Sequence, residues 1–419
     1  MIALAWPVGQ RLLAGGGALA LLVLAPFPGT PFGSPFGSRS EVARPSDYER
    51  DLATYDVRLR AAKLDDARTP ELELRYRRAT LVGDTAALAN LASTLTAAGR
   101  SDSLLSLRVD LSLHRLDAAL PRLNALSAAA DATAFELLRA QMLAQTGQTT
   151  EASEFFARLI RKNKHWEAFA GLAAIEATYG RYARADALYE RAADELDAHQ
   201  MRAYSWVLLQ RGLLRLRQGN VAEAMQFYGQ AEKAYGGSWL VDDYVAEALA
   251  AAGRHEEAVA RYRTAIAKSP RPELKQALGD LYLYLGKPDL AIPWLDAAHA
   301  AYTNSVSRGE AHYLHHLARF YADSRPDAEK AVALAQRDLE LRQTAATYDM
   351  LAWALYRDSQ FERARHALAS ALATGARDAD TCLHAALIEL ALGDSSRGQY
   401  WLQQVAALNP RNGAFHVHR

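Results

Sequence analysis

The chain has 419 residues, half of them apolar, and its 48 basic and 48 acidic side chains give a formal net charge of zero. The balanced charge argues against a nucleic-acid-binding protein, because such proteins need an excess of basic side chains to neutralise phosphates. The single cysteine, Cys382, excludes an intramolecular disulfide and a zinc site built from paired cysteines.

The first 25 residues predict an export signal. Arg11 precedes an uncharged and mostly apolar segment from Leu12 to Ala25, which has the length of a signal-peptide core and is short for a transmembrane helix. Pro26 follows directly and disfavours cleavage after Ala25, so residues 1–25 are either a signal peptide or a retained N-terminal anchor. Because the positive charge precedes the apolar segment, both alternatives predict an exported chain, periplasmic or secreted.

Two regions separate this segment from the main part of the chain. Residues 26–46 are rich in Pro, Gly and Ser and repeat the unit Pro-Phe-Gly-Ser, a composition that predicts a flexible linker. Residues 47–131 have a helical composition in which Ala119 and Leu123 fit a weak repeat. We interpret them as degenerate helical N-terminal repeats.

Residues 132–412 contain about eight copies of one pattern. In the clearest copy, LGDLYLYLGKPDLAIPWLDAA, the marker Gly286 is followed by Ala291 after five residues and Leu295 after nine. The other copies also place a small side chain five or six residues after a marker that can end a helix. The pattern predicts two antiparallel helices per copy. The small side chains let these two helices pack closely against each other. The markers are residues 147, 180, 219, 253, 286, 325, 359 and 393.

The repeat resembles the tetratricopeptide repeat family, whose unit is a helix-turn-helix of about 34 residues. The motif LGDLY, from Leu278 to Tyr282, carries the resemblance best. It implies an all-α fold, an α-solenoid in which antiparallel helix pairs form a right-handed superhelix. Some copies depart from the family pattern, because Arg139 and Arg211 occupy inward-facing sites. In three copies a charged residue replaces the aromatic side chain found at Tyr282, namely Glu176, Arg215 and Glu389.

The resemblance also implies that the first helix of each pair lines a concave groove. Residues on one stripe of these helices combine carboxylates, histidines and aromatic side chains, which suits a groove for an extended peptide. Ordinary solvated polar residues on a concave face are the alternative. The candidate groove residues are Asp243, Glu247, Gln276, Asp280, Tyr284, His312, His315, Arg319, Asp349, Trp353 and Tyr356.

The sequence HYLHH, from His312 to His316, is the one cluster with metal-like spacing. No third ligand is fixed by the spacing, so the interpretation is a set of exposed polar histidines, with no metal and no cofactor. Motifs typical of hydrolases, phosphate-binding loops and dinucleotide sites are absent from the sequence.

These features predict a non-enzymatic scaffold that binds a protein or peptide partner in its concave groove, in cell-envelope assembly or maturation. Residues 413–419 are interpreted as a C-terminal tail, and the oligomeric state stays open. The alternative is an α/α-toroid enzyme active on polysaccharides, with Asp243, Glu247 or Asp280 as acid and base.

Overall fold

The computed structural model describes residues 44–62, 69–126 and 132–416. The predicted signal segment and nearly all of the predicted linker lie outside the described residues. From Ser46 onward the chain forms one compact unit. Its described residues are helical and contain no strand, which confirms the all-α prediction. None of the helices in this described part is long and apolar enough to cross a membrane.

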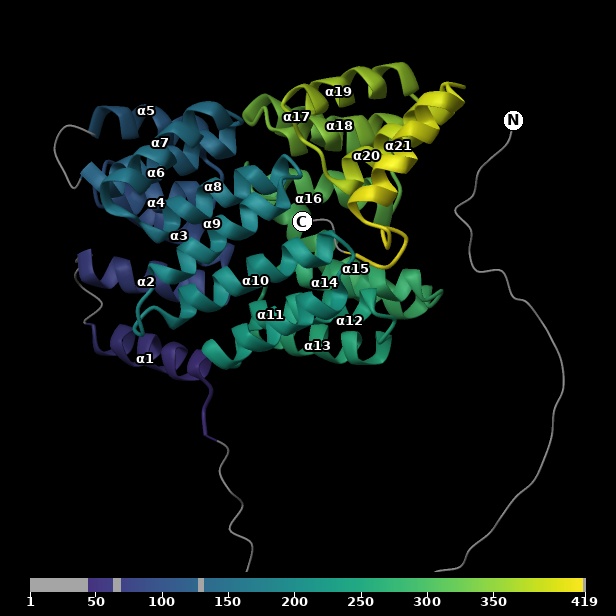
Figure 1. Ribbon diagram of the computed structural model, residues 1–419. Helices are drawn as coiled ribbons and strands as arrows, with labels where there is room; N and C mark the ends of the chain where they lie inside the picture. Colours follow the sequence, from purple (N-terminus) through teal and green to yellow (C-terminus); the bar gives the residue numbers. More distant parts are fainter. Residues whose placement is uncertain (1–43, 63–68, 127–131, 417–419) are drawn as a thin grey trace, which may run out of the picture. The chain divides into compact units, whose positions relative to one another are not determined.

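The described residues form one leading helix, α1 (Asp47–Ala61), and ten helix pairs in chain order (Figure 1). The first helices of the pairs are α2 (Thr69–Val82), α4 (Leu104–Ser112), α6 (Ala132–Thr146), α8 (Trp166–Thr178), α10 (Met201–Arg217), α12 (Trp239–Ala251), α14 (Pro272–Tyr284), α16 (Leu314–Arg319) continued by the π-helical turn η1 (Phe320–Ser324), α18 (Ala345–Arg357) and α20 (Ala379–Ala391).

The second helices of the pairs are α3 (Thr85–Ala97), α5 (Leu116–Leu126), α7 (Thr149–Asn163), α9 (Tyr182–Asp194), α11 (Val221–Ala234), α13 (His255–Lys268), α15 (Pro288–Ser307), α17 (Ala328–Leu341), α19 (Phe361–Ala373) and α21 (Ser395–Leu408). Consecutive pairs, such as α10–α11 and α12–α13, pack side by side (Figure 1). This arrangement is the α-solenoid expected from the repeat.

The predicted markers end the first helices as expected. Gly286 has φ +67° and Ser359 φ +59°, in the left-handed region that closes a helix. Arg325 is the exception, with φ −140°. There the first helix ends in the π-helical turn η1, which accommodates the extra residue of this copy.

The small and aromatic positions of the repeat form the core. Tyr228 and Tyr262, nine residues after their markers, are fully buried, and burying a side chain of this size contributes about 2 kcal/mol. A Cβ atom added to Gly279 would lie 2.6 Å from Cδ2 of Leu295, so the glycine sets how closely α14 approaches α15. In the last pair the equivalent Leu402 is exposed, because no further pair covers it.

The solenoid winds back onto itself. We call α2–α11 the N-terminal coil and α12–α21 with the tail 409–416 the C-terminal coil. The backbone N–H of Gln343 donates to the carbonyl of Thr146 over 3.3 Å, and that of Arg377 donates to Thr178 over 3.1 Å. Trp239 donates through Nε1 to the carbonyl of Leu81 over 2.8 Å. Loops of the C-terminal coil therefore rest on the helix-pair turns of the N-terminal coil.

Candidate functional site

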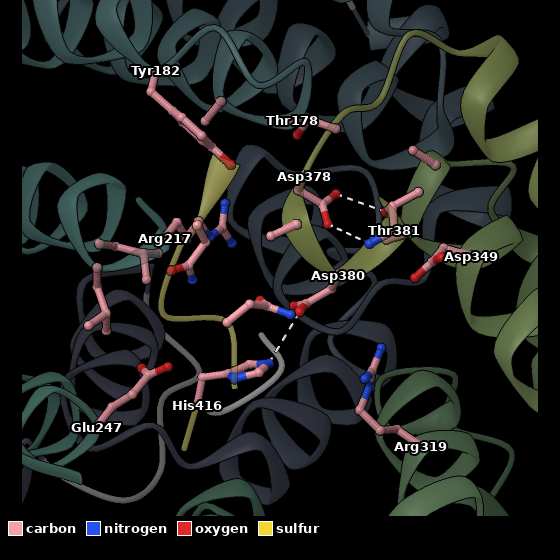
Figure 2. Close-up of a pocket in the computed structure, with 18 of the residues that line it drawn as sticks. Thr178, Tyr182, Arg217, Glu247, Arg319, Asp349, Asp378, Asp380, Thr381 and His416 are labelled. Carbon is pink, nitrogen blue, oxygen red and sulfur yellow. Dashed lines mark hydrogen bonds and ion pairs between the residues drawn. The ribbon is translucent and has the colours of Figure 1, made fainter. Parts of the chain in front are cut away.

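A pocket of about 190 Å³ lies on the inner surface where the two coils meet. Figure 2 shows the side chains that line it. They come from α8, α9 and α10 of the N-terminal coil, from α12, α16, α18 and α20 of the C-terminal coil, and from the tail. Its polar lining includes Thr178, Tyr182, Arg217, Glu247, His315, Arg319, Asp349, Asp378, Asp380, Thr381, Asn409, Asn412 and His416.

Three carboxylates of the pocket gather around the start of α20. Asp378 caps this helix, because its carboxylate accepts the backbone N–H of Thr381 and the hydroxyl of Thr381, each over 2.9 Å. Burial, with the charges of Asp349 and Asp380 nearby, raises the pKa of Asp378. The three carboxylates thus lie close together on this side of the pocket (Figure 2).

Asp349 is held by a buried histidine. Its carboxylate lies 2.9 Å from Nδ1 of His384, and the ring of Trp353 stacks on His384 with centroids 4.4 Å apart. Burial alone would lower the pKa of His384, but the charge and hydrogen bond of Asp349 raise it above its usual value. The buried pair fixes the orientation of Asp349 at the pocket wall.

Two guanidinium groups line the pocket beside these carboxylates. Arg319 is largely buried, and its Nε and Nη1 atoms have no hydrogen-bond partner among the described residues. Its Nη1 atom lies 3.9 Å from a carboxylate oxygen of Asp323. Arg217 lines the pocket at the end of α10 and forms no ion pair within the described part of the chain. Arg217 therefore has hydrogen-bonding capacity left for a ligand, whereas the unpaired Nε and Nη1 atoms of Arg319 are themselves buried.

The tail supplies a third cation. Nε2 of His416 lies 3.2 Å from Oδ1 of Asp380, and Nδ1 lies 3.0 Å from the carbonyl of Ala414 (Figure 2). Burial lowers the pKa of His416, but the Asp380 hydrogen bond and charge, the Ala414 carbonyl and the charge of Glu247 together raise it to about 9. The imidazole is therefore protonated at neutral pH.

Four of the candidate groove residues line this pocket: Glu247, His315, Arg319 and Asp349. The sequence interpretation missed Arg217, Asp378, Asp380, Thr381 and His416. Asp380 lies thirteen residues before the marker Gly393. Glu273 and His312 have the same spacing from the markers of their own copies, Gly286 and Arg325. Extending the stripe to the last repeat would have found it.

The other candidates lie elsewhere on the inner surface. Asp243 is buried on α12. Gln276 accepts the hydroxyl of Tyr302 over 2.9 Å and donates to the hydroxyl of Ser324 over 3.0 Å. Burial raises the pKa of the nearby Asp280 to about 7. Gln276 thus belongs to an internal hydrogen-bond network, which leaves it less free for a ligand.

The aromatic candidates have partners within the protein. Trp353 donates through Nε1 to Asp323 over 2.9 Å and stacks on Tyr356 with centroids 5.1 Å apart. Tyr284 is half exposed, and its ring lies 5.6 Å from that of Phe415 in the tail. Of these three, Tyr284 has the most surface open to a partner.

The histidine cluster differs from the expectation of exposed side chains. His312 is 8% exposed and stacks on His114 with centroids 5.1 Å apart, and Nδ1 of His315 lies 3.4 Å from Asp338. The interpretation as exposed polar histidines is wrong, because His312 packs against His114 of the N-terminal coil and His315 lies against Asp338 of α17. Among the described residues no group of three or more His, Cys, Asp or Glu side chains could hold a metal ion.

No protein-family model and no curated protein matches the chain. The structure is similar to a chain of the APC/C hetero-tetramer Cut9–Hcn1, with a TM-score of 0.48 and 18% identity, covering 87% of this chain and 73% of that chain. It is also similar to human IFIT1, from its dimer with PPP-AAAA, with a TM-score of 0.42 and 13% identity, covering 88% of this chain and 92% of that chain. The likeness to pilF of Pseudomonas aeruginosa has a TM-score of 0.31 and 17% identity, and it covers 51% of this chain and 94% of that chain. These values carry no conclusion about function.

Proposed function

We propose that the chain is a non-catalytic scaffold that binds a protein partner by taking a short segment of it into the inner pocket. One observation carries the proposal: charged side chains from both coils converge on one pocket, where Arg217 forms no ion pair within the described part of the chain. A tightly wound solenoid offers this site in place of an open groove. The side chains expected to contact the partner are Arg217, Glu247, Arg319, Asp349 and Asp380.

The size of the pocket favours a side chain as the ligand. Small-molecule and cofactor sites usually have volumes of roughly 300–1,000 Å³, whereas this pocket has about 190 Å³. A water molecule takes about 30 Å³, so the pocket has room for one or two side chains of a partner. The mixture of carboxylates and guanidinium groups suits a polar or charged segment.

The geometry favours binding over the alternative of polysaccharide hydrolysis. The raised pKa of Asp280, about 7, would suit a general acid. Glycoside hydrolysis however needs two carboxylates facing one substrate, and of the three named for this chemistry, Asp243, Glu247 and Asp280, Glu247 alone lines the pocket. A hydrolysis screen in which Asp280→Asn abolishes turnover would favour the enzyme.

The binding proposal is tested by crosslinking with mass spectrometry in native cells. We expect Arg217→Ala to lower the yield of the crosslinked partner by about tenfold or more, because a pocket-lining arginine is a typical hot spot. Arg254→Ala is the matched control, since Arg254 is exposed and pairs with Glu257 outside the pocket. Equal capture by the wild type and the Arg217→Ala variant, with an unchanged helical signal, would contradict the proposal.

We further propose that the chain acts outside the cytoplasm, in assembly or maturation of the cell envelope. The support is the apolar segment Leu12–Ala25 behind Arg11. A reporter fused after Asp47 should be active only outside the cytoplasm. Activity inside the cytoplasm would refute export.

A further inference from the structure

The tail returns from the end of α21 to the inner surface of the solenoid. The ideal position of a Cβ atom on Gly219 lies 2.7 Å from Oδ1 of Asn409, so the tail passes close to the turn between α10 and α11. Within the tail, the backbone N–H of Ala414 donates to the carbonyl of Arg411 over 2.8 Å. The tail thus makes its own turn where it lines the pocket.

Phe415 is the apolar anchor of the tail. It is 6% exposed and belongs to the same buried cluster as Leu213, Tyr244 and Leu281. The centroid of its ring lies 5.6 Å from that of Tyr284, and the Tyr284 ring in turn lies 6.0 Å from the ring of His255. An aromatic side chain enclosed in this way is the usual anchor of a bound peptide.

His416 is the polar anchor. Its ion pair with Asp380 has a length of 3.2 Å, and Glu247 lies on the same side of the pocket (Figure 2). Because the side chain has two-thirds of its surface covered, the ion pair is worth more than one in open solvent. The carboxylates of the pocket therefore select a cation next to the aromatic side chain.

Side chains, and not backbone pairing, hold the tail. The backbone donors of Asn412 and Ala414 bond to carbonyls of the tail itself, and Pro410, Arg411 and Gly413 are exposed. The hydrogen bond from His416 to Asp380 joins the tail to α20. Two anchors on an otherwise solvated segment are the pattern of a docked ligand.

We propose that the site of Phe415 and His416 is a receptor for an aromatic side chain followed by a cationic one on a partner protein, and that the chain's own tail is its tethered occupant. This inference rests on the proposed binding function and names the chemistry of the partner segment. Tethering holds the tail at an effective concentration of about millimolar. A partner must therefore bind more tightly than the tail in order to replace it.

The test measures binding of a fluorescent peptide with the sequence of residues 409–419, NPRNGAFHVHR, by anisotropy. The full chain carrying Phe415→Ala and His416→Ala has an open site and should bind the peptide about tenfold or more tightly than the wild type, whose tail competes. A peptide with alanine in place of its phenylalanine should not bind. The single variant His416→Ala should give an intermediate affinity.

Two results would overturn the inference. Equal affinity for the wild type and the double variant would show that the tail does not compete. Absence of binding to the double variant or to His416→Ala, with wild-type circular dichroism, would show that the site does not recognise the peptide. If partner capture still depended on Arg217 in either case, the proposed function would stand and only the tail inference would fail.

Discussion

Gly279 shows how a single missing side chain sets the distance between two helices. A Cβ atom there would meet Cδ2 and Cγ of Leu295 at 2.6 and 2.7 Å. We expect Gly279→Ala to destabilise the protein by about 1–3 kcal/mol, because the helices must separate or Leu295 must leave its preferred rotamer. Denaturant unfolding monitored by circular dichroism measures the effect.

Gly229 on α11 is the matched control. It is also a helical glycine, but nothing lies within 4 Å of an added Cβ atom. Gly229→Ala should therefore stabilise the protein by about 0.5–1 kcal/mol through helix propensity alone. Equal effects of the two substitutions would contradict the packing role of Gly279.

Three histidines at the contact between the coils, the buried His312 and the partly buried His114 and His316, make the fold sensitive to acid. Burial lowers the pKa of His114 and of His316 to about 4, with Arg342 adding to the effect in both cases. Burial also lowers the pKa of His312, whose ring nitrogens have no hydrogen-bond partner among the described residues. These groups bind protons more readily in the unfolded chain, so stability is present above pH 6.5 and falls as the pH drops towards 4.

His312→Phe tests this dependence. The substitution keeps an aromatic ring against His114 and removes one group that must stay uncharged, so the loss of thermal stability between pH 7 and pH 4.5 should be smaller than in the wild type. His366→Phe, on the exposed face of α19, should leave the pH dependence unchanged. An acid loss in His312→Phe as large as that of the wild type would contradict the account.

At the scale of the element, the sequence predicts most of the repeat because each pair obeys a local rule. The left-handed marker, the small residue five positions later and the filled position nine residues later all act within one pair, as Gly253, Ala258 and Tyr262 show. Such local signals can be read without knowledge of the rest of the fold.

Elements that break the local rule could not be predicted from it. His114 has a left-handed φ of +54° between α4 and α5. A positive φ is uncommon for residues other than glycine, so the sequence does not predict it at this position. The extra residues after Gly286 continue α15 to Ser307, with Tyr302 fully buried. Pro293 lies inside α15, which continues past it.

At the scale of the whole molecule, the winding decides which side chains meet. Thr178 and Arg217 come from the N-terminal coil, whereas Asp349 and Asp380 come from the C-terminal coil. Contacts between residues so far apart in the chain leave no periodic signal in one sequence. Some residues of the candidate stripe line the pocket and others belong to the buried hydrogen-bond network, a division that could not be predicted from the sequence.

The most direct test of the account concerns the contact between the coils, without which the pocket does not form. A Cβ atom on Gly147 would lie 2.1 Å from the carbonyl oxygen of Gln343, whereas one on Gly253 would meet nothing within 4 Å. Both glycines have a left-handed φ, so the two alanine variants share the same backbone strain and differ in the clash alone. Hydrogen–deuterium exchange of the segment around Gln343, whose amide donates to Thr146, should be faster in Gly147→Ala and unchanged in Gly253→Ala. Equal exchange in both variants would contradict the stacked coils and the pocket between them.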